Sequence, residues 1–418
     1  MKLAFVVPRY GRQVRGGAET GARQLASRLA LLPDWSVEVL TTTAVDSGTW
    51  REELAAGSAE EDGVLVRRFA CRSGRHPDFD AYSGPTLSGA ADRTEAEARD
   101  WIERQGPVSP GLIEAVRTSD ADAVAFYPYL YHPTAVGLPL APTPTLLHAA
   151  AHDEPAIRLP IFQNVFGAAD GLVFHSRSER DLVGSLFPVG GHRQIVLGLG
   201  VDDAPPGPIP PPEALGGRPF LLCLGRVDEQ KGVGALWRFF LAYKRRRPGP
   251  LALVLAGPVV DAPPGHPDLV VTGPVSEALK WSLLRHCQTL VSPSPFESFS
   301  LVVAEAWAAG SPVLVNAVCA ATMENVRRSG GGLHYRGYAE FEGTVDRLLG
   351  DPGLRAALAA RGAAYVSAHF SWTVVIERYR SFVLKVVSRA DPRYIGPAPG
   401  SATMGTPVTP VTRATPLP

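Results

Sequence analysis

Residues 220–246 read FLLCLGRVDEQKGVGALWRFFLAYKRR, and this stretch decides the fold. Five apolar residues are followed by a glycine-containing loop, and then by a segment whose apolar residues recur with helical spacing. This order is typical of a strand, a loop and a helix in a parallel α/β sheet. The chain begins in the same way, because LAFVV precedes Pro8 and a helical pattern starts near Glu19.

The alternation continues in both halves and predicts an α/β protein with two Rossmann-like, doubly wound domains facing a cleft. The expected strands are residues 2–7, 36–41, 64–69, 123–127, 144–148, 171–174, 220–224, 251–256, 270–272, 289–292 and 312–316. The expected helices are the one from residue 19, then 93–104, 233–246, 277–286, 301–309, 339–350, 351–369 and 373–387. Residues 70–110 are rich in Gly, Pro, Ser and charge, and no other regular structure is expected there.

A proline-rich segment, GLGVDDAPPGPIPPPEALGGRP at residues 198–219, separates the two halves. Such a segment is stiff and cannot join a central strand, so it predicts an interdomain spacer. The predicted parts are a first domain (1–199), a linker (200–219), a second domain (220–370), a last helix (371–390) and a disordered Pro/Thr-rich tail (391–418).

Composition excludes several classes of protein. Lys and Arg together number 41, as do Asp and Glu, and this neutral balance argues against a nucleic-acid partner. No run of 18 apolar residues predicts a membrane span, and the first apolar run is too short for a signal peptide. The four cysteines are far apart and form no CxxC pair, which favours reduced, buried thiols in a cytoplasmic protein.

The first candidate site is the loop Arg15-Gly16-Gly17-Ala18-Glu19, before the first helix. Adjacent glycines let a ligand approach the backbone, and a helix N-terminus favours an anion such as a diphosphate. The alternative is a tight turn with Glu19 in the first helical turn. The G-x-G-x-x-G spacing of dinucleotide-binding proteins is absent from this loop.

The second candidate site is LGRVDEQKG at residues 224–232, between a predicted strand and a predicted helix. Arg226 and Lys231 are expected at the carboxyl end of the sheet, where doubly wound sheets bind ligands. A guanidinium can contact two phosphate oxygens, and an ammonium adds a point charge. Lys231 is one of only five lysines in the chain. The alternative is a solvated pair of charges on a loop.

The third candidate site is PSPFESFSLVVAEA at residues 293–306. Glu305 lies within an apolar helix and therefore needs a partner, which ribose hydroxyls could supply. Glu297 lies about 12 Å away if the intervening residues are helical, which suits a sugar at one carboxylate and a ribose at the other. The backbone of residues 298–301 is a second candidate anion site. The alternative is a capping Glu297 and a salt-bridged core Glu305.

These motifs together resemble a GT-B glycosyltransferase of glycosyltransferase family 4, a family of retaining enzymes that use nucleotide sugars. The matches run in order through most of the chain. They are GGAE at 16–19, His152-Asp153, Gly200-Val201-Asp202, G-R-x₄-K-G at 225–232, Gly273-Pro274-Val275-Ser276, E-x₇-E from Glu297 to Glu305, and EAWAAGSPV at 305–313.

The resemblance implies a role for each matching position. His152, Glu297, Arg226 and Lys231 would be the catalytic residues, with Arg226 and Lys231 on the donor diphosphate and Glu297 on the transferred sugar. Glu305 would hold the ribose, and the backbone near Val275 would meet the base. The implied donor-binding set is Gly16, Gly17, Gly225, Arg226, Lys231, Val275, Glu297, Ser300, Leu301 and Glu305. The last helix would cross back onto the first domain.

Two segments depart from the family pattern. Ser300 stands where many members have the glycine of Glu-x-Phe-Gly, which alters how closely the backbone approaches the sugar phosphate. NAVCAATMEN at residues 316–325 replaces a glycine-rich version.

No metal or other cofactor is expected. Asp78-Phe79-Asp80 and Asp120-Ala121-Asp122 have the Asp-x-Asp spacing of metal-dependent transferases. The first lies in an irregular loop and the second precedes its strand, so both are interpreted as solvated. Arg226, Lys231 and helix N-termini would stabilise the leaving diphosphate instead. By the family pattern the sugar would keep its anomeric configuration, and His152 would position it. His148 and His175 are interpreted as structural.

The predicted function is transfer of a hexose-type sugar from a nucleoside-diphosphate sugar to a glycan, lipid-linked or small-molecule acceptor. Two alternatives stay open at this point: a nucleotide-sugar epimerase with the same fold, and a non-catalytic protein that binds sugar nucleotides or glycans. Residues 243–247, YKRRR, end a predicted helix that bears Trp237, Phe239 and Phe240. One hypothesis is peripheral contact with an anionic membrane surface. The alternative is that the basic residues only complement the dipole at the end of the helix. A role in cell-envelope glycan synthesis is an analogy.

Overall fold

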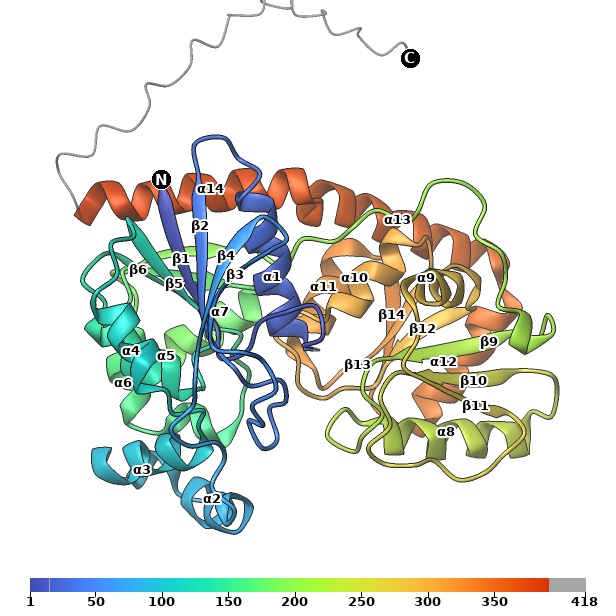
Figure 1. Ribbon diagram of the computed structural model, residues 1–418. Helices are drawn as coiled ribbons and strands as arrows, with labels where there is room; N and C mark the ends of the chain where they lie inside the picture. Colours follow the sequence, from blue (N-terminus) through green and yellow to red (C-terminus); the bar gives the residue numbers. More distant parts are fainter. Residues whose placement is uncertain (15, 391–418) are drawn as a thin grey trace, which may run out of the picture.

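The computed structural model describes residues 1–14 and 16–390 (Figure 1). Two α/β domains are built around separate sheets. The predicted tail, residues 391–418, lies outside the described residues. The predicted domain boundaries at residues 199, 219 and 370 stay predictions.

The first domain holds an eight-stranded sheet in the order β3-β4-β2-β1-β5-β6-β7-β8. All neighbours are parallel except β3 and β4. Helices cover both faces, as parallel strands require, since their side chains are apolar on both sides. The strands are β1 (Lys2–Val6), β2 (Ser36–Thr42), β3 (Gly57–Glu61), β4 (Val64–Phe69), β5 (Ala123–Phe126), β6 (Thr145–His148), β7 (Gly171–Phe174) and β8 (Arg193–Val196). The helices are α1 (Gly17–Leu29), α2 (Phe79–Leu87), α3 (Glu95–Gln105), α4 (Pro110–Arg117), α5 (His132–Gly137), α6 (Ile161–Ala168) and α7 (Arg177–Leu186).

The second domain holds a six-stranded parallel sheet in the order β11-β10-β9-β12-β13-β14. The strands are β9 (Phe220–Leu224), β10 (Ala252–Ala256), β11 (Leu269–Gly273), β12 (Thr289–Ser292), β13 (Val313–Asn316) and β14 (Gly332–Tyr335). The helices are α8 (Val233–Arg246), α9 (Glu277–His286), α10 (Leu301–Ala308), α11 (Ala320–Ser329), α12 (Tyr338–Gly350) and α13 (Pro352–Phe370).

The last helix, α14 (Trp372–Ala390), leaves the second domain after α13 and runs across the first, as Figure 1 shows in red. Its buried residues Val375, Tyr379 and Val383 belong to the core that also holds Phe5 of β1. The Tyr379 hydroxyl lies 2.9 Å from Nε2 of His148 in β6. The predicted return of the last helix to the first domain is therefore confirmed.

The prediction missed nine of these strands and helices, which are β3, β8, β14, α2, α4, α5, α6, α7 and α11. Several of them have a weak pattern. Strand β3 reads GSAEE and is an exposed, antiparallel edge strand, while β8 is only half-buried. Helix α2 contains Pro85, which suggested an irregular loop. The prediction also left out α11, which begins within NAVCAATMEN, and the strand β14 that follows it.

The helix considered for membrane contact is packed against its own domain. Phe240 and Tyr243 are buried, and Trp237 and Phe239 pack on the same core. The Lys244 ammonium is buried on the carbonyl of Leu251, at 3.0 Å. The structure therefore gives no support to peripheral contact through these side chains. Among residues 1–14 and 16–390, no helix has the length and apolar character to cross a bilayer.

Candidate functional site

Loops from the two domains meet at the predicted site. His152 follows β6, and its ring lies 5.9 Å from the ring of Phe296, which follows β12. His175 follows β7, and its Nδ1 lies 3.3 Å from Oγ of Ser298. The carboxyl ends of both sheets therefore face each other here, as the fold requires of a ligand site.

The double-glycine loop is shaped by a buried ion pair. Glu19 in the first turn of α1 pairs with Arg9, and both side chains are less than one-tenth exposed. A Cβ at Gly16 would lie 2.1 Å from the Glu19 carboxylate, so a larger residue there would have to displace this side chain from its pair with Arg9. A Cβ at Gly17 would meet no protein atom within 4 Å. Gly17 is thus dispensable for packing and leaves space for a ligand. Arg15 lies outside the described residues.

The second and third predicted motifs join through an ion pair. Lys231 Nζ lies 2.8 Å from Oε1 of Glu297. The contact forms because Gly232, with φ of 71°, places the start of α8 against the loop after β12. A Cβ on Gly232 would lie 2.6 Å from the carbonyl oxygen of Pro293. The ammonium and the carboxylate are 39% and 20% exposed, so both can reach a bound molecule.

Arg226 lies on the same loop and pairs with Asp228. Asp228 is buried and also accepts the backbone N–H of Lys231, at 2.7 Å. It thereby fixes both ends of the RVDEQK loop. The guanidinium of Arg226 remains 45% exposed, at a position able to contact an anion. Asp228 was missed by the sequence analysis, although it stands between the two predicted cations.

Glu305 has a protein partner that the sequence did not reveal. Lys280 of α9 lies 2.9 Å from its Oε1 and 2.7 Å from Glu277. Burial raises the pKa of Glu305, and the nearby Lys280 only partly offsets that rise. Burial alone would lower the pKa of Lys280, but the two carboxylates outweigh it and raise that pKa. Glu305 is therefore salt-bridged within the core, as the alternative interpretation expected. Only the rarity of lysine pointed to Lys280.

Ser300 adopts a glycine-like backbone. Its φ of 70° lies in the left-handed region, which costs a residue with a Cβ about 1–2 kcal/mol. The residue is buried and precedes α10, whose first turn it does not cap with its side chain. Ser300 therefore adopts a conformation that favours glycine, the residue that many members of the resembled family have here, and it adds a hydroxyl to the site.

Three helix N-termini at the site lack side-chain caps. These are α1 after Gly16, α8 after Gly232 and α10 after Ser300. By contrast, Ser276 caps α9 with its hydroxyl. The first N–H groups of an uncapped helix are free to bind an anion. Leu301 opens α10, and Val275 is half-buried just before the cap of α9. Gly225, with φ of 133°, directly follows β9.

A buried carboxylate holds the loop that carries His152. Glu179 of α7 accepts the N–H of Ala151 at 2.7 Å and the N–H of His175 at 2.6 Å. Ala150 next to it has φ of 51°, an unfavourable conformation for alanine. Burial raises the pKa of Glu179 to about 8, against the opposing effect of these N–H groups. The sequence carried a signal for Glu179 in the S-x-x-E spacing from Ser176.

The two histidines interpreted as structural are buried. Tyr127 connects them, since its ring stacks on His148 and its hydroxyl lies 2.8 Å from Nε2 of His175. Burial lowers the pKa of His175 to about 4 and lowers the pKa of His148 well below its usual value. Both imidazoles are therefore neutral near pH 7. What the sequence did not suggest is that His175 also reaches Ser298 in the other domain.

The two Asp-x-Asp segments lie away from this site. Asp78 and Asp80 are exposed at the start of α2. Asp120 pairs with Lys2, and Asp122 accepts the Lys2 backbone N–H at 2.7 Å. Among residues 1–14 and 16–390, no cluster of three or more His, Cys, Asp and Glu side chains is arranged to hold a metal ion.

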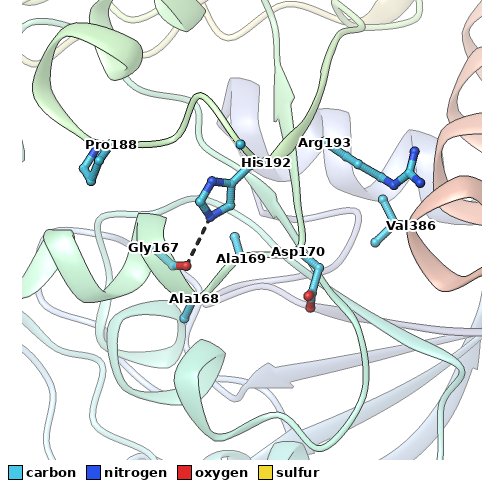
Figure 2. A pocket seen from close by; sticks show the side chains of 9 residues that line it. Gly167, Ala168, Ala169, Asp170, Pro188, His192, Arg193 and Val386 are labelled. Carbon is cyan, nitrogen blue, oxygen red and sulfur yellow. Dashed lines mark hydrogen bonds between the residues drawn. The ribbon is translucent and has the colours of Figure 1, made fainter. Parts of the chain in front are cut away.

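A separate cavity of about 500 Å³ lies at the edge of the first sheet, beside β8 and α14 (Figure 2). Its lining includes Asp170, His192 and Arg193, and His192 Nε2 lies 3.1 Å from the carbonyl oxygen of Gly167. None of the predicted site residues lines it. The candidate site is therefore formed by the loops between the two domains, where the loop with His152 contacts the loop with Glu297.

The two parallel-sheet domains and the returning helix define the GT-B fold. Residues 218–351 match the family model described as glycosyl transferases group 1. A sucrose-phosphate synthase from Thermosynechococcus elongatus superposes with a TM-score of 0.67, covering 93% of this chain and 99% of that chain at 17% identity. HepE of Anabaena, solved with UDP and glucose, gives a TM-score of 0.64, covering 92% and 100% at 14% identity.

Among curated proteins, a D-inositol 3-phosphate glycosyltransferase from Stackebrandtia nassauensis is 30% identical over 258 residues. The match covers 54% of this chain and 57% of that protein. The chain thus spans less than two thirds of the length of this relative. The sequence prediction of a GT-B fold is confirmed, and the matched family segment coincides with the second domain.

Proposed function

We propose that this protein is a retaining glycosyltransferase of family 4, which transfers a hexose from a nucleoside-diphosphate sugar without a metal ion. The observation that carries the proposal is the Lys231–Glu297 pair. It lies beside the exposed Arg226, and the loop that holds Glu297 meets His152 of the other domain. Cations for a diphosphate and a carboxylate for a sugar are thereby combined at one place.

The chemistry follows from the charges at this place. Breaking the bond between the sugar and the diphosphate leaves negative charge on the leaving group, and Arg226 and Lys231 would stabilise it. Glu297 would accept hydrogen bonds from sugar hydroxyls. The uncapped N-termini of α1 and α10 would add N–H donors to the same anion. No step in this scheme requires a metal.

Retention of configuration would follow if the acceptor hydroxyl attacks the face from which the diphosphate departs. The transition state is then oxocarbenium-like, and the leaving phosphate can take the acceptor's proton. His152 would position the sugar. Its Nε2 lies 3.6 Å from the carboxylate of Glu154, which in turn accepts the hydroxyl of Tyr129.

The relatives suggest which substrates to test first. HepE was solved with UDP and glucose, and the Stackebrandtia relative is named for inositol 3-phosphate. UDP-glucose is therefore the first donor for this chain, and a phosphorylated polyol is the first acceptor.

The experiment measures thermal stabilisation by UDP, GDP, dTDP and ADP, each with magnesium and with a chelator. A nucleotide at 100 times its dissociation constant stabilises one site by about 2.7 kcal/mol. The expected result is stabilisation by one base that survives the chelator, is lost in Arg226→Ala and is kept in Arg117→Ala. Arg117 is the control because it is exposed and, among the described residues, pairs only with Glu114 of its own helix.

Transfer is then followed with the corresponding sugar nucleotide, and the anomeric configuration of the product is read by NMR. An inverted product would contradict retention, and stabilisation that disappears with chelator would contradict metal independence. Binding of the nucleotide without transfer or slow hydrolysis would favour a non-catalytic binding protein.

A further inference from the structure

A second cavity between the domains, of about 510 Å³, is lined by cationic side chains. Its walls come from α7 and β8 of the first domain and from α11, α13 and α14. Four arginines line it: Arg177, Arg180, Arg328 and Arg378. None of Gly17, His152, Arg226, Lys231 and Glu297 lines it, whereas His175, which contacts Ser298 beside Glu297, forms part of its wall. The cavity therefore adjoins the proposed transferase site without sharing those five residues.

The protein supplies few negative charges to this cavity. Glu324 is the only carboxylate in its lining, and it accepts the N–H groups of Arg177 and Ser178 at 3.3 and 2.8 Å. The same carboxylate lies 3.4 Å from Arg328. Arg180 pairs with Asp181. Within residues 1–14 and 16–390, Arg177 and Arg378 form no ion pair with any carboxylate.

The uncompensated charge also acts on its neighbours. The pKa of Arg378 is lowered, first by partial burial and then by repulsion from Arg328. The pKa of His369 is lowered by burial and by Arg328, Arg378 and Arg177. Such mutual repulsion is destabilising, and a bound anion would relieve it.

We propose that this cavity binds a small molecule that carries phosphoryl groups and so bridges the two domains. Guanidinium groups bind phosphoryl oxygens through paired, charge-assisted hydrogen bonds. The volume lies within the range of small-molecule sites, about 300–1,000 Å³. Arg177 belongs to the first domain and Arg328 to the second, so one anion contacts both domains. Glu324, a carboxylate of the second domain bound at the N-terminus of α7, already makes a contact of this kind.

The test uses inorganic pyrophosphate as the probe and titration calorimetry on the full chain. Pyrophosphate also suits the proposed donor site, so the starting protein carries Arg226→Ala and Lys231→Ala. On this background we expect one remaining site, whose affinity falls at least about tenfold when Arg177→Gln and Arg378→Gln are added. The control adds Arg104→Gln and Arg117→Gln, which also remove two positive charges, but from intrahelical pairs outside the cavity. We expect its affinity to be unchanged.

Absence of pyrophosphate binding on the Arg226→Ala, Lys231→Ala background would overturn the proposal, whatever the fate of the transferase activity. An equal loss of pyrophosphate affinity on substitution of Arg177 and Arg378 and on substitution of Arg104 and Arg117 would also overturn it, because the loss would then depend only on net charge. Folding is checked in phosphate-free buffer, where removal of Arg177 and Arg378 should leave the melting temperature unchanged or raised.

Phosphoryl groups also occur on lipids, so sedimentation with phosphatidic acid vesicles is measured in parallel. The proposal predicts binding of free pyrophosphate and no sedimentation that depends on Arg177 and Arg378. Vesicle binding through these arginines without binding of the free ion would overturn the small-molecule site.

Discussion

Ser300 has a backbone that its side chain disfavours, at the place where the site needs a close turn. We expect Ser300→Gly to raise the free energy of unfolding by about 0.5–1 kcal/mol. Relief of the left-handed conformation outweighs the added flexibility of the unfolded chain. The measurement is the midpoint of urea unfolding. Ser300→Ala is the matched control, because it keeps the Cβ and removes only the hydroxyl, and a gain as large in Ala as in Gly would contradict the explanation.

A substitution at Gly17 tests whether a ligand binds in the open space beside the first loop. Its Cβ would meet no protein atom, so Gly17→Ala should leave the melting temperature within about a degree of the original protein. Turnover with the sugar nucleotide should fall by at least about tenfold, since small displacements of a reacting group are costly. Gly343→Ala in α12 is the control, because its Cβ is equally unobstructed. Equal activity of the two variants would remove Gly17 from the site.

At the scale of elements, Lys280 and Glu305 join α9 to α10. The side chains are 17% and 13% exposed, so loss of one partner leaves a mostly buried charge alone. Lys280→Met should lower the free energy of unfolding by about 3 kcal/mol, and Lys280→Met with Glu305→Leu should recover most of that loss. Chemical denaturation of the two variants measures both values. Additive losses in the double variant would show that the pair is not coupled.

Glu277 provides the control for this pair. It also contacts Lys280, but its side chain is 79% exposed. Glu277→Gln should therefore change stability by less than about 0.5 kcal/mol. A loss comparable with that of Lys280→Met would place the stabilising contact on the helix surface instead of between α9 and α10.

At the scale of the whole molecule, the two domains should respond differently to acid. The buried histidines among the described residues are His132, His148 and His175, all in the first domain. Burial lowers the pKa of His132 and of His175 to about 4, below the usual 6.5. Below pH 6.5 these histidines therefore bind protons in the unfolded chain but stay unprotonated in the folded domain. Each histidine then reduces stability by about 1.4 kcal/mol per pH unit until the folded pKa is reached.

Glu179 opposes this trend, because its raised pKa lets the folded state take up a proton between pH 8 and 4.5. Three histidines outweigh one carboxyl group, so the first domain should lose stability between pH 6.5 and 4. Hydrogen exchange at pH 7 and pH 5 should show protection lost first in β5, β6 and β7. His132→Gln should reduce the effect. Earlier loss of protection in the second domain would contradict this prediction.

The order of strands and helices could be predicted where side chains alternate with a clear period. Strands β1, β9 and β10 are mostly buried apolar runs bounded by loops, so local sequence alone defines them. The motifs at Arg226, Lys231 and Glu297 were located in the same way, because loops at the carboxyl ends of parallel strands lie on one edge. Edge strand β3 and helix α2 have no such period, since exposure or an internal proline blurs it.

The sequence by itself determined the class of fold, the positions of the loops and the charges those loops carry. Only the tertiary structure decided which charges meet. Glu305 needed a partner, but nothing in its own helix identified Lys280, 25 residues earlier in the chain. The contact of His175 with Ser298 spans 123 residues. A periodic pattern reports which face of an element is buried, whereas a pairing depends on how two folded elements are placed against each other.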